Sequence, residues 1–246
     1  MNRDEFLKAV KEDPYQIENA DEAFKKDKEI VLIAVSQNGS VLEYAHASLK
    51  KDREVVLAAV KNAGQAIQFA DKLFRKDKEI IMTALEEYGD YLQYADVSLK
   101  KDKKIVMMAI KTAGESLEFA DASFKKDKEV VLMAINRSSN ALEFADSSLK
   151  KDKKIVMIAV EQNGYSLKYA DASLKKDREI VLVAVKSNGN SLNDVDKSLK
   201  KDKEITLAAV NSTGSSLEYA DDIFKKDKEI VLAAVKNEAA AIEYAD

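Results

Sequence analysis

The chain has 246 residues, of which 46% are hydrophobic and 34% are charged, with one proline and seven glycines. This composition supplies enough apolar material for a core, so the chain is not predicted to be disordered. It contains no cysteine, which excludes a disulfide framework and cysteine-ligated metal sites. The net charge of −4 predicts no general attraction to nucleic acid or acidic membranes. Because no apolar run spans a bilayer and no signal peptide starts the chain, we expect a cytoplasmic protein without a membrane partner.

An aspartate that follows two basic residues recurs every 25 residues, without insertion or deletion. It stands at Asp27, Asp52, Asp77, Asp102, Asp127, Asp152, Asp177, Asp202 and Asp227. Asn2 lies one period before Asp27, so the sequence predicts ten repeats. They start at residues 2, 27, 52, 77, 102, 127, 152, 177, 202 and 227, and the last is truncated. Such a fixed period is typical of a solenoid, in which each repeat buries its apolar surface only against its neighbours.

The first part of each repeat is an apolar run such as "EIVLIAV" at 29–35, which is compatible with a buried strand or with a helix. An alanine recurs in this run, as at Ala34, and methionines occupy other positions of it, which disfavours a strand. Asp27 is a good helix N-cap, and Glu29 suits the first turn. Gly39 follows the run, as a glycine does at the C′ position of many helices. We therefore predict a three-turn helix over about 28–38.

The second part of each repeat follows this glycine. "SVLE" at 40–43 resembles a capping box, and Leu42, Tyr44, Ala45 and Leu49 are predicted to be buried. A carboxylate such as Asp71 recurs in this part, where it opposes the negative end of a helix but can cap a new turn. The sequence thus predicts an all-α solenoid of ten 25-residue units over 1–246, as a single domain. Each unit is a three-turn helix plus a short helix and a 3₁₀ turn.

The segments "DREVVLAAVKNAGQAIQFA" (52–70) and "DREIVLVAVKSNGNSLNDV" (177–195) resemble the repeats of the domain of unknown function numbered 4116. The repeats of that family share a D-[RK]-E-x-V-L-x-A-V-x-x-N-G core followed by L-x-x-A. The resemblance covers essentially the whole chain. It implies α-helical repeats and brings no activity or functional residue. The layout of a repeat is also similar to the leucine-rich repeat variant, an α/3₁₀ superhelix.

No set of residues in the sequence is typical of an enzyme. His46 is the only histidine and stands where other repeats have aspartate, which indicates a substituted turn cap. The glycines occur singly rather than in a phosphate-binding cluster. The carboxylates repeat one role, so no acid and base pair is set apart. We therefore expect no enzymatic activity, no cofactor and no metal.

The basic clusters around the repeated aspartates contain 27 of the 40 basic residues. Their net charge is +13 when the nine aspartates and the residue after each cluster, which is glutamate seven times and lysine twice, are counted as well. They predict a strip for nucleic acid or another polyanion. The candidate residues are Lys100, Lys101, Lys103, Lys104, Lys150, Lys151, Lys153 and Lys154. The favoured interpretation is that the lysines end one helical turn and the aspartate starts the next helix. The aromatic residues that single-strand binders use for stacking are missing from these clusters.

The turn between the two parts of a repeat varies most. In the fourth repeat it carries an acidic and aromatic patch, Glu86, Glu87, Tyr88, Asp90 and Tyr91. Repeat proteins bind partners through variable surfaces with aromatic anchors, whereas neutral drift on an exposed loop is the alternative. We predict a non-enzymatic scaffold for protein–protein interaction. Polyanion binding is the first alternative, and a purely structural spacer is the second.

The two ends of the chain differ. In the first repeat Lys8, Pro14 and Asn19 replace the residues usual at their positions, which gives a polar end typical of a capping repeat. The last repeat keeps its apolar helix "IVLAAV". This pattern predicts end-to-end self-association through the C-terminal repeat, or continuation into a longer array.

Overall fold

A computed structural model describes all residues from 1 to 246. It contains α-helices and 3₁₀ helices and no strand. The chain divides into two compact parts, Met1–Asp121 and Ala122–Asp246. The predicted all-α class with repeated units is confirmed, and the strand interpretation of the apolar runs is wrong.

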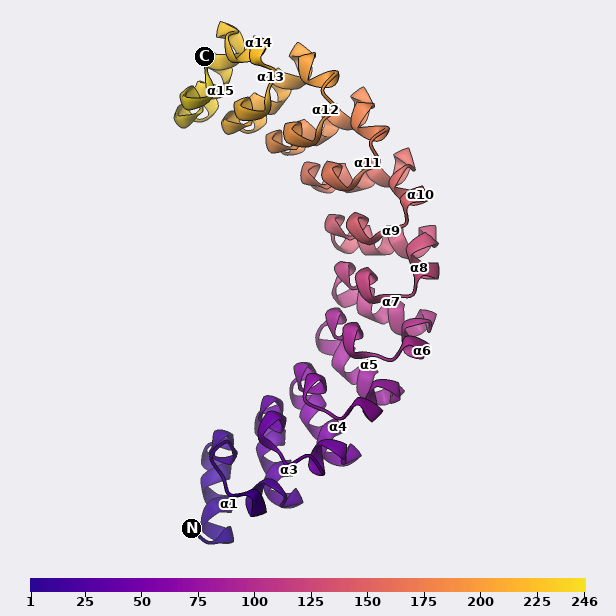
Figure 1. Cartoon of the computed structure of the whole chain (residues 1–246), viewed down its shortest axis with the longest axis vertical. Coiled ribbons are helices and arrows are strands. Elements are labelled where there is room, and N and C mark those ends of the chain that lie inside the picture. The colour runs from indigo at the N-terminus through magenta and orange to yellow at the C-terminus, as the bar shows by residue number, and fades with distance from the viewer. The chain divides into compact units, whose positions relative to one another are not determined.

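Ten-residue α-helices are the main elements of both parts. The first part has α1 (Arg3–Glu12), α3 (Lys28–Gln37), α4 (Arg53–Asn62), α5 (Lys78–Glu87) and α7 (Lys103–Thr112). The second has α9 (Lys128–Arg137), α11 (Lys153–Gln162), α12 (Arg178–Ser187), α13 (Lys203–Ser212) and α15 (Lys228–Asn237). Within each part, successive helices of this set pack against each other (Figure 1).

The aspartates of the basic clusters start these helices, as predicted. The Asp27 carboxylate accepts the N–H groups of Glu29 and Ile30, at 3.1 and 3.2 Å. These are backbone donors that have no partner inside the helix. The same cap occurs at Asp52, Asp77, Asp102, Asp127, Asp152, Asp177, Asp202 and Asp227.

A 3₁₀ helix follows each ten-residue helix. These elements are η1 (Pro14–Ile17), η2 (Gly39–Tyr44), η4 (Gly64–Gln68), η6 (Gly89–Tyr94), η7 (Gly114–Phe119), η8 (Ser139–Phe144), η9 (Gly164–Tyr169), η11 (Gly189–Asp194), η13 (Gly214–Tyr219) and η14 (Ala239–Tyr244).

A short helical segment then leads to the next repeat. These segments are α2 (Glu22–Lys25), η3 (Leu49–Lys51), η5 (Lys72–Lys76), α6 (Val97–Lys100), α8 (Ala122–Lys126), α10 (Ser147–Lys150), η10 (Leu174–Lys176), η12 (Leu199–Lys201) and α14 (Asp222–Lys225). Asp71 caps its segment by accepting the Leu73 N–H at 3.0 Å, as predicted. His46 has the same role, because its Nδ1 accepts the Ser48 N–H at 3.2 Å.

The core lies between successive repeats. Ile30, Val31, Ala34 and Val35 of α3 are fully buried, and the equivalent positions are buried in most repeats. Complete burial of one such aliphatic side chain contributes about 1.5 to 3 kcal/mol before the loss of conformational entropy. The expected burial of Tyr44 is wrong, because this side chain is only half-buried.

The repeated glycine has a different role from the one predicted. Asn38, which ends α3, is in the extended region, and no residue has a positive φ. Gly39 therefore does not end the helix in a left-handed conformation. A Cβ atom on Gly39 would lie 2.1 Å from the carbonyl oxygen of Ala59, on the helix of the next repeat. Only a residue without a side chain permits this close approach of two backbones.

No helix is both long and apolar enough to cross a membrane.

Candidate functional site

In most clusters the last basic residue forms ion pairs with the next repeat. Lys28 Nζ lies 2.8 Å from a carboxylate oxygen of Asp52 and 2.8 Å from one of Glu54. Equivalent pairs at 2.6 to 2.8 Å are Arg3–Asp27, Arg53–Asp77, Lys78–Asp102, Lys128–Asp152, Lys153–Asp177, Arg178–Asp202 and Lys203–Asp227. The aspartate thus caps its own helix and binds the preceding repeat.

The two lysines before Asp52 also have partners. Lys50 Nζ donates to the Glu43 carbonyl at 2.6 Å, and the Lys50 carbonyl accepts the Asp71 N–H at 2.9 Å. Lys51 Nζ lies 3.8 Å from the Asp71 carboxylate. Among the candidate strip residues, Lys100 and Lys150 repeat the first contact, whereas Lys101 and Lys151 pair with Asp121 and Asp171.

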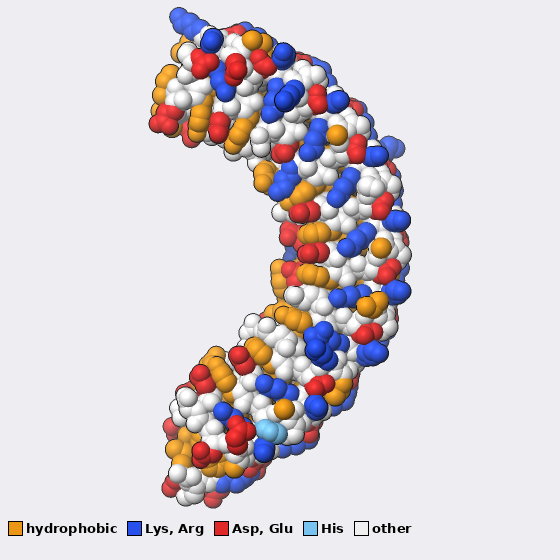
Figure 2. Space-filling model, in the orientation of Figure 1, with side chains coloured by type: hydrophobic (Ala, Val, Ile, Leu, Met, Phe, Trp, Pro, Cys, Tyr) orange, Lys and Arg blue, Asp and Glu red, His pale blue; other side chains and the backbone are white.

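These contacts shift the titration of the charged groups. The hydrogen bond from Lys28 holds the pKa of Asp52 below its ordinary value, and the hydrogen bonds to Asp52 and Glu54 raise the pKa of Lys28. Part of the positive charge of the basic clusters is therefore paired with carboxylates. On the face shown in Figure 2, basic side chains are interspersed with acidic, apolar and neutral ones.

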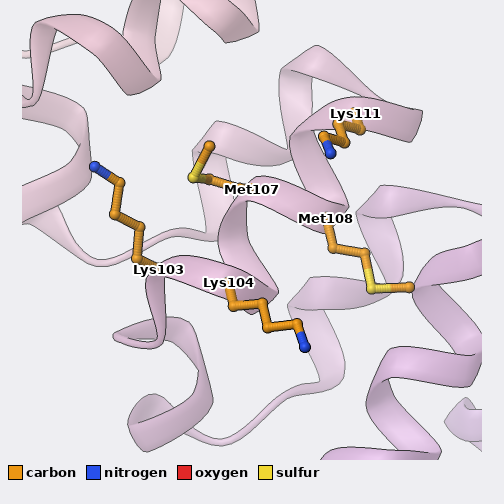
Figure 3. Close-up of a pocket in the computed structure, with 5 residues that line it drawn as sticks. All are labelled: Lys103, Lys104, Met107, Met108 and Lys111. Atoms are coloured by element: carbon orange, nitrogen blue, oxygen red, sulfur yellow. The ribbon is translucent and has the colours of Figure 1, made fainter.

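Lys104 and Lys154 are exceptions among the candidate strip residues. They stand where most repeats have glutamate, and neither forms an ion pair. Lys104 also lines a pocket on α7, together with Lys103, Met107, Met108 and Lys111 (Figure 3). Lys103 and Lys104 point in opposite directions there, so their ammonium groups do not converge on one point.

The patch of the fourth repeat lies where α5 ends and η6 begins. Tyr88 is the residue between the two helices, and its ring contacts that of Tyr91 edge-on, at 5.9 Å between centroids and 81° between planes. The Tyr91 ring lies 6.5 Å from that of Tyr94. We call Tyr88, Tyr91 and Tyr94 the tyrosine edge. Tyr94 is not among the residues predicted for the patch, although it lies three residues after Tyr91, and residues three apart are neighbours on a helix.

Carboxylates surround the tyrosine edge. A hydrogen bond to Asp90 raises the pKa of Tyr88, and burial together with the charge of Glu87 raises the pKa of Tyr91. Glu86 is exposed, and 46% of Tyr88 is exposed. Glu87 has a structural role as well, because its carboxylate accepts the Gly64 N–H of the preceding repeat. The five predicted patch residues are thus adjacent, and one of them also joins two repeats.

The seventh repeat contains another group of tyrosines, Tyr165 and Tyr169, which was not predicted from the sequence. Lys168 of η9 places its Nζ 4.4 Å from the centroid of the Tyr165 ring and 4.6 Å from that of Tyr169. It also donates to the Tyr165 hydroxyl at 3.1 Å. Hydrogen bonds to Tyr169 and Tyr165 raise the pKa of Lys168. This lysine is therefore a cation held by two aromatic rings.

The C-terminal repeat exposes apolar side chains. Leu232 and Ile242 are 58% and 56% exposed, whereas Leu217, which precedes Ile242 by one period, is fully buried. The end-to-end self-association expected from the sequence would use this surface, and it stays a prediction.

Repeated ten-residue helices, nearly all capped by an aspartate and most of them joined to the next repeat by ion pairs, define a helical-repeat protein. The chain belongs to the family "Domain of unknown function (DUF4116)". The family matches it at residues 2–50, 35–75, 77–125, 127–175, 152–200, 177–225 and 202–246. No curated protein and no solved structure matches the chain.

Proposed function

We propose that this chain is a non-enzymatic helical-repeat scaffold that binds a partner protein through the tyrosine edge of its fourth repeat. The observation that carries the proposal is the group of three tyrosines on a variable turn, next to Glu86 and Asp90. Tyrosine is enriched among the residues that dominate binding energy, because it combines a large apolar ring with a polar tip.

A stack of helical repeats, as found within each part, is an architecture that suits this function. Within each part, side-chain hydrogen bonds and ion pairs connect residues that are 23 to 27 positions apart, as between stacked neighbours. Such a stack presents the same turn of every repeat along one edge. A repeat can then acquire a binding residue at this edge without loss of the contacts that hold the stack together.

Affinity purification with three baits tests the proposal: the wild-type chain, Tyr88→Ala and Tyr165→Ala. Tyr165 is a matched control, since it lies on the corresponding turn of the seventh repeat. It is 43% exposed, against 46% for Tyr88. We expect at least one protein that the wild type and Tyr165→Ala retain and Tyr88→Ala loses. Identical partners for all three baits would contradict binding at the tyrosine edge. If the wild-type chain retains no specific partner, the result would favour the alternative of a purely structural spacer.

Binding of a polyanion is a second candidate function, favoured by Lys104 and Lys154, which replace glutamate and lack ion pairs. Retention on immobilised heparin tests it, because binding through lysine falls linearly with the logarithm of the salt concentration. The double variant Lys104→Glu/Lys154→Glu restores the glutamate of the other repeats. If it is retained as the wild type is, or if neither is retained at low salt, the polyanion function is wrong.

A further inference from the structure

The seventh repeat shows what tyrosines on this turn bind. The Lys168 ammonium lies within 5 Å of the centroids of Tyr165 and Tyr169, inside the roughly 6 Å range of cation–π attraction. Its hydrogen bond to the Tyr165 hydroxyl fixes it there. In this repeat the chain supplies the cation itself.

The fourth repeat has the aromatic rings and lacks the cation. Three periods before Lys168 the chain has Gln93, and three periods before Tyr169 it has Tyr94. The position of Tyr165 is Asp90 in the fourth repeat, where Tyr88 and Tyr91 on either side of it supply the further rings. The segment 79–99 contains no lysine or arginine. No side chain of this segment can therefore play the role of Lys168.

The charge around the tyrosine edge is negative. Glu86, Glu87 and Asp90 lie within one turn of it along the chain, and the charge of Glu115 in the next repeat also acts on Tyr88. Lys61 and Lys111 occupy the position of Glu86 in the preceding and the following repeat. The nearest positive charges in this register are therefore one repeat away on each side. Carboxylates next to aromatic faces attract a cation by its charge and by the quadrupole of the rings.

We infer that the tyrosine edge binds a lysine or arginine side chain of the partner protein, in the way that Tyr165 and Tyr169 bind Lys168. The inference rests on the proposed function and adds the chemistry of the partner. The partner presents a basic segment, because the rings and carboxylates together select positive charge. A guanidinium group also stacks on aromatic rings, which makes arginine the sharper probe.

The test is a titration of the ¹⁵N-labelled chain with the peptide acetyl-Gly-Ser-Arg-Arg-Ser-Gly-amide, followed by amide chemical shifts. The control peptide carries citrulline in place of each arginine, which keeps the shape and removes the charge. We expect the arginine peptide to shift the amides of residues 86–94 and the citrulline peptide to leave them in place. Tyr88→Leu, which keeps an apolar side chain, should weaken binding of the arginine peptide at least threefold.

Lys168→Ala provides a second, independent readout. It removes the internal cation and leaves Tyr165 and Tyr169 in place, so we expect the arginine peptide to cause new shifts at residues 165–169 in this variant only. Equal shifts from both peptides, no shifts at 86–94, or no new shifts in Lys168→Ala would each overturn the inference. Shifts at 86–94 that depend on protein concentration without peptide would indicate a second copy of the chain as the partner, and would overturn it too. If Tyr88→Ala still loses a partner in the purification, the proposed function stands without the inference.

Discussion

The backbone N–H of Gly39 donates to Oδ1 of Asn62 at 2.7 Å, across the boundary between two repeats. Nδ2 of Asn62 donates in turn to the carbonyl of Ser36 in the last turn of α3, at 3.0 Å. One amide side chain therefore satisfies a carbonyl at the end of one helix and an N–H at the start of the 3₁₀ helix after it. Gly39 is buried, and a buried backbone N–H needs such a partner.

Removal of the Asn62 side chain tests this link between repeats. We expect Asn62→Ala to lower the free energy of unfolding by about 1 to 3 kcal/mol, because the buried N–H of Gly39 loses its acceptor. Asn62→Asp is the matched control, since it keeps an acceptor and loses the donor to Ser36, so it should cost less. Urea denaturation followed by circular dichroism measures both. Equal stability of the wild type and Asn62→Ala would contradict the role of the side chain.

The close approach of Gly39 to the next helix makes a second prediction. In Gly39→Ala the new Cβ would lie 2.1 Å from a backbone carbonyl oxygen, so the two repeats must move apart, at a cost of about 1 to 3 kcal/mol. Gly64→Ala is a milder change, because the nearest backbone atom lies at 2.9 Å and the nearest atom of all belongs to the flexible Glu87 side chain. In thermal unfolding, the melting temperature of Gly39→Ala should therefore be lower than that of Gly64→Ala. The reverse order would contradict the steric explanation.

The helix of each repeat could be predicted from the sequence because its causes are local. Asp27 and the N–H groups that it caps are two and three residues apart. The reason for Gly39 could not be predicted, since Ala59 is twenty residues away and belongs to the next repeat. Local sequence offers only the helix-terminating role for this glycine, and the structure replaces it with close packing.

The candidate sites show the same limit. Glu86 to Tyr91 are adjacent in the chain, so their grouping followed from the sequence. The ion pairs between repeats did not follow, because Lys28 and Asp52 meet only when two repeats stack at a definite register. The cation–π contact of Lys168 likewise depends on the direction of two rings in η9.

Asp52 makes a prediction about pH. The hydrogen bond from Lys28 depresses its pKa below the ordinary value of about 4, so its ionised form stabilises the fold above this pH, and the contribution is lost as the pH falls through the depressed pKa. Asp52→Asn keeps a capping acceptor and removes the charge, at an expected cost of up to about 1 kcal/mol at pH 7. Urea denaturation at pH 7, 5 and 3 should show this cost shrinking below pH 4.

The control for this pH effect is Asp52→Ala, which also removes the cap and should cost about 1 kcal/mol more than Asp52→Asn. This difference in the free energy of unfolding between Asp52→Ala and Asp52→Asn should persist at pH 3. The reason is that a protonated carboxyl of Asp52, like the amide of Asn, still offers an oxygen to the helix N–H groups, whereas Ala offers none. A cost of Asp52→Asn that is the same at all three pH values would contradict a role for the charge.

We call the ion pairs that connect successive repeats the ladder of ion pairs. It lacks one pair at Lys104 in the first part of the chain, and replacement of Lys104 by glutamate should supply that pair. Lys78 pairs with Asp102 at 2.7 Å, but the residue that would be its second partner is Lys104, whereas Lys28 binds both Asp52 and Glu54. In Lys104→Glu a repulsive neighbour becomes an acceptor, and a negative charge in the first turn of α7 also suits the helix dipole. We expect a gain in stability of up to about 1 kcal/mol, because both groups are exposed.

The reverse exchange, Glu54→Lys, gives Lys28 the surroundings that Lys78 has, so it should destabilise the chain by a similar amount. Both effects should become smaller at 1 M salt, where charges on the surface are screened within about 3 Å. The measurement is the urea midpoint of the two variants at low and high salt. If Lys104→Glu and Glu54→Lys shift the midpoint in the same direction, or if salt leaves both shifts unchanged, the ladder of ion pairs does not set the stability of the stack.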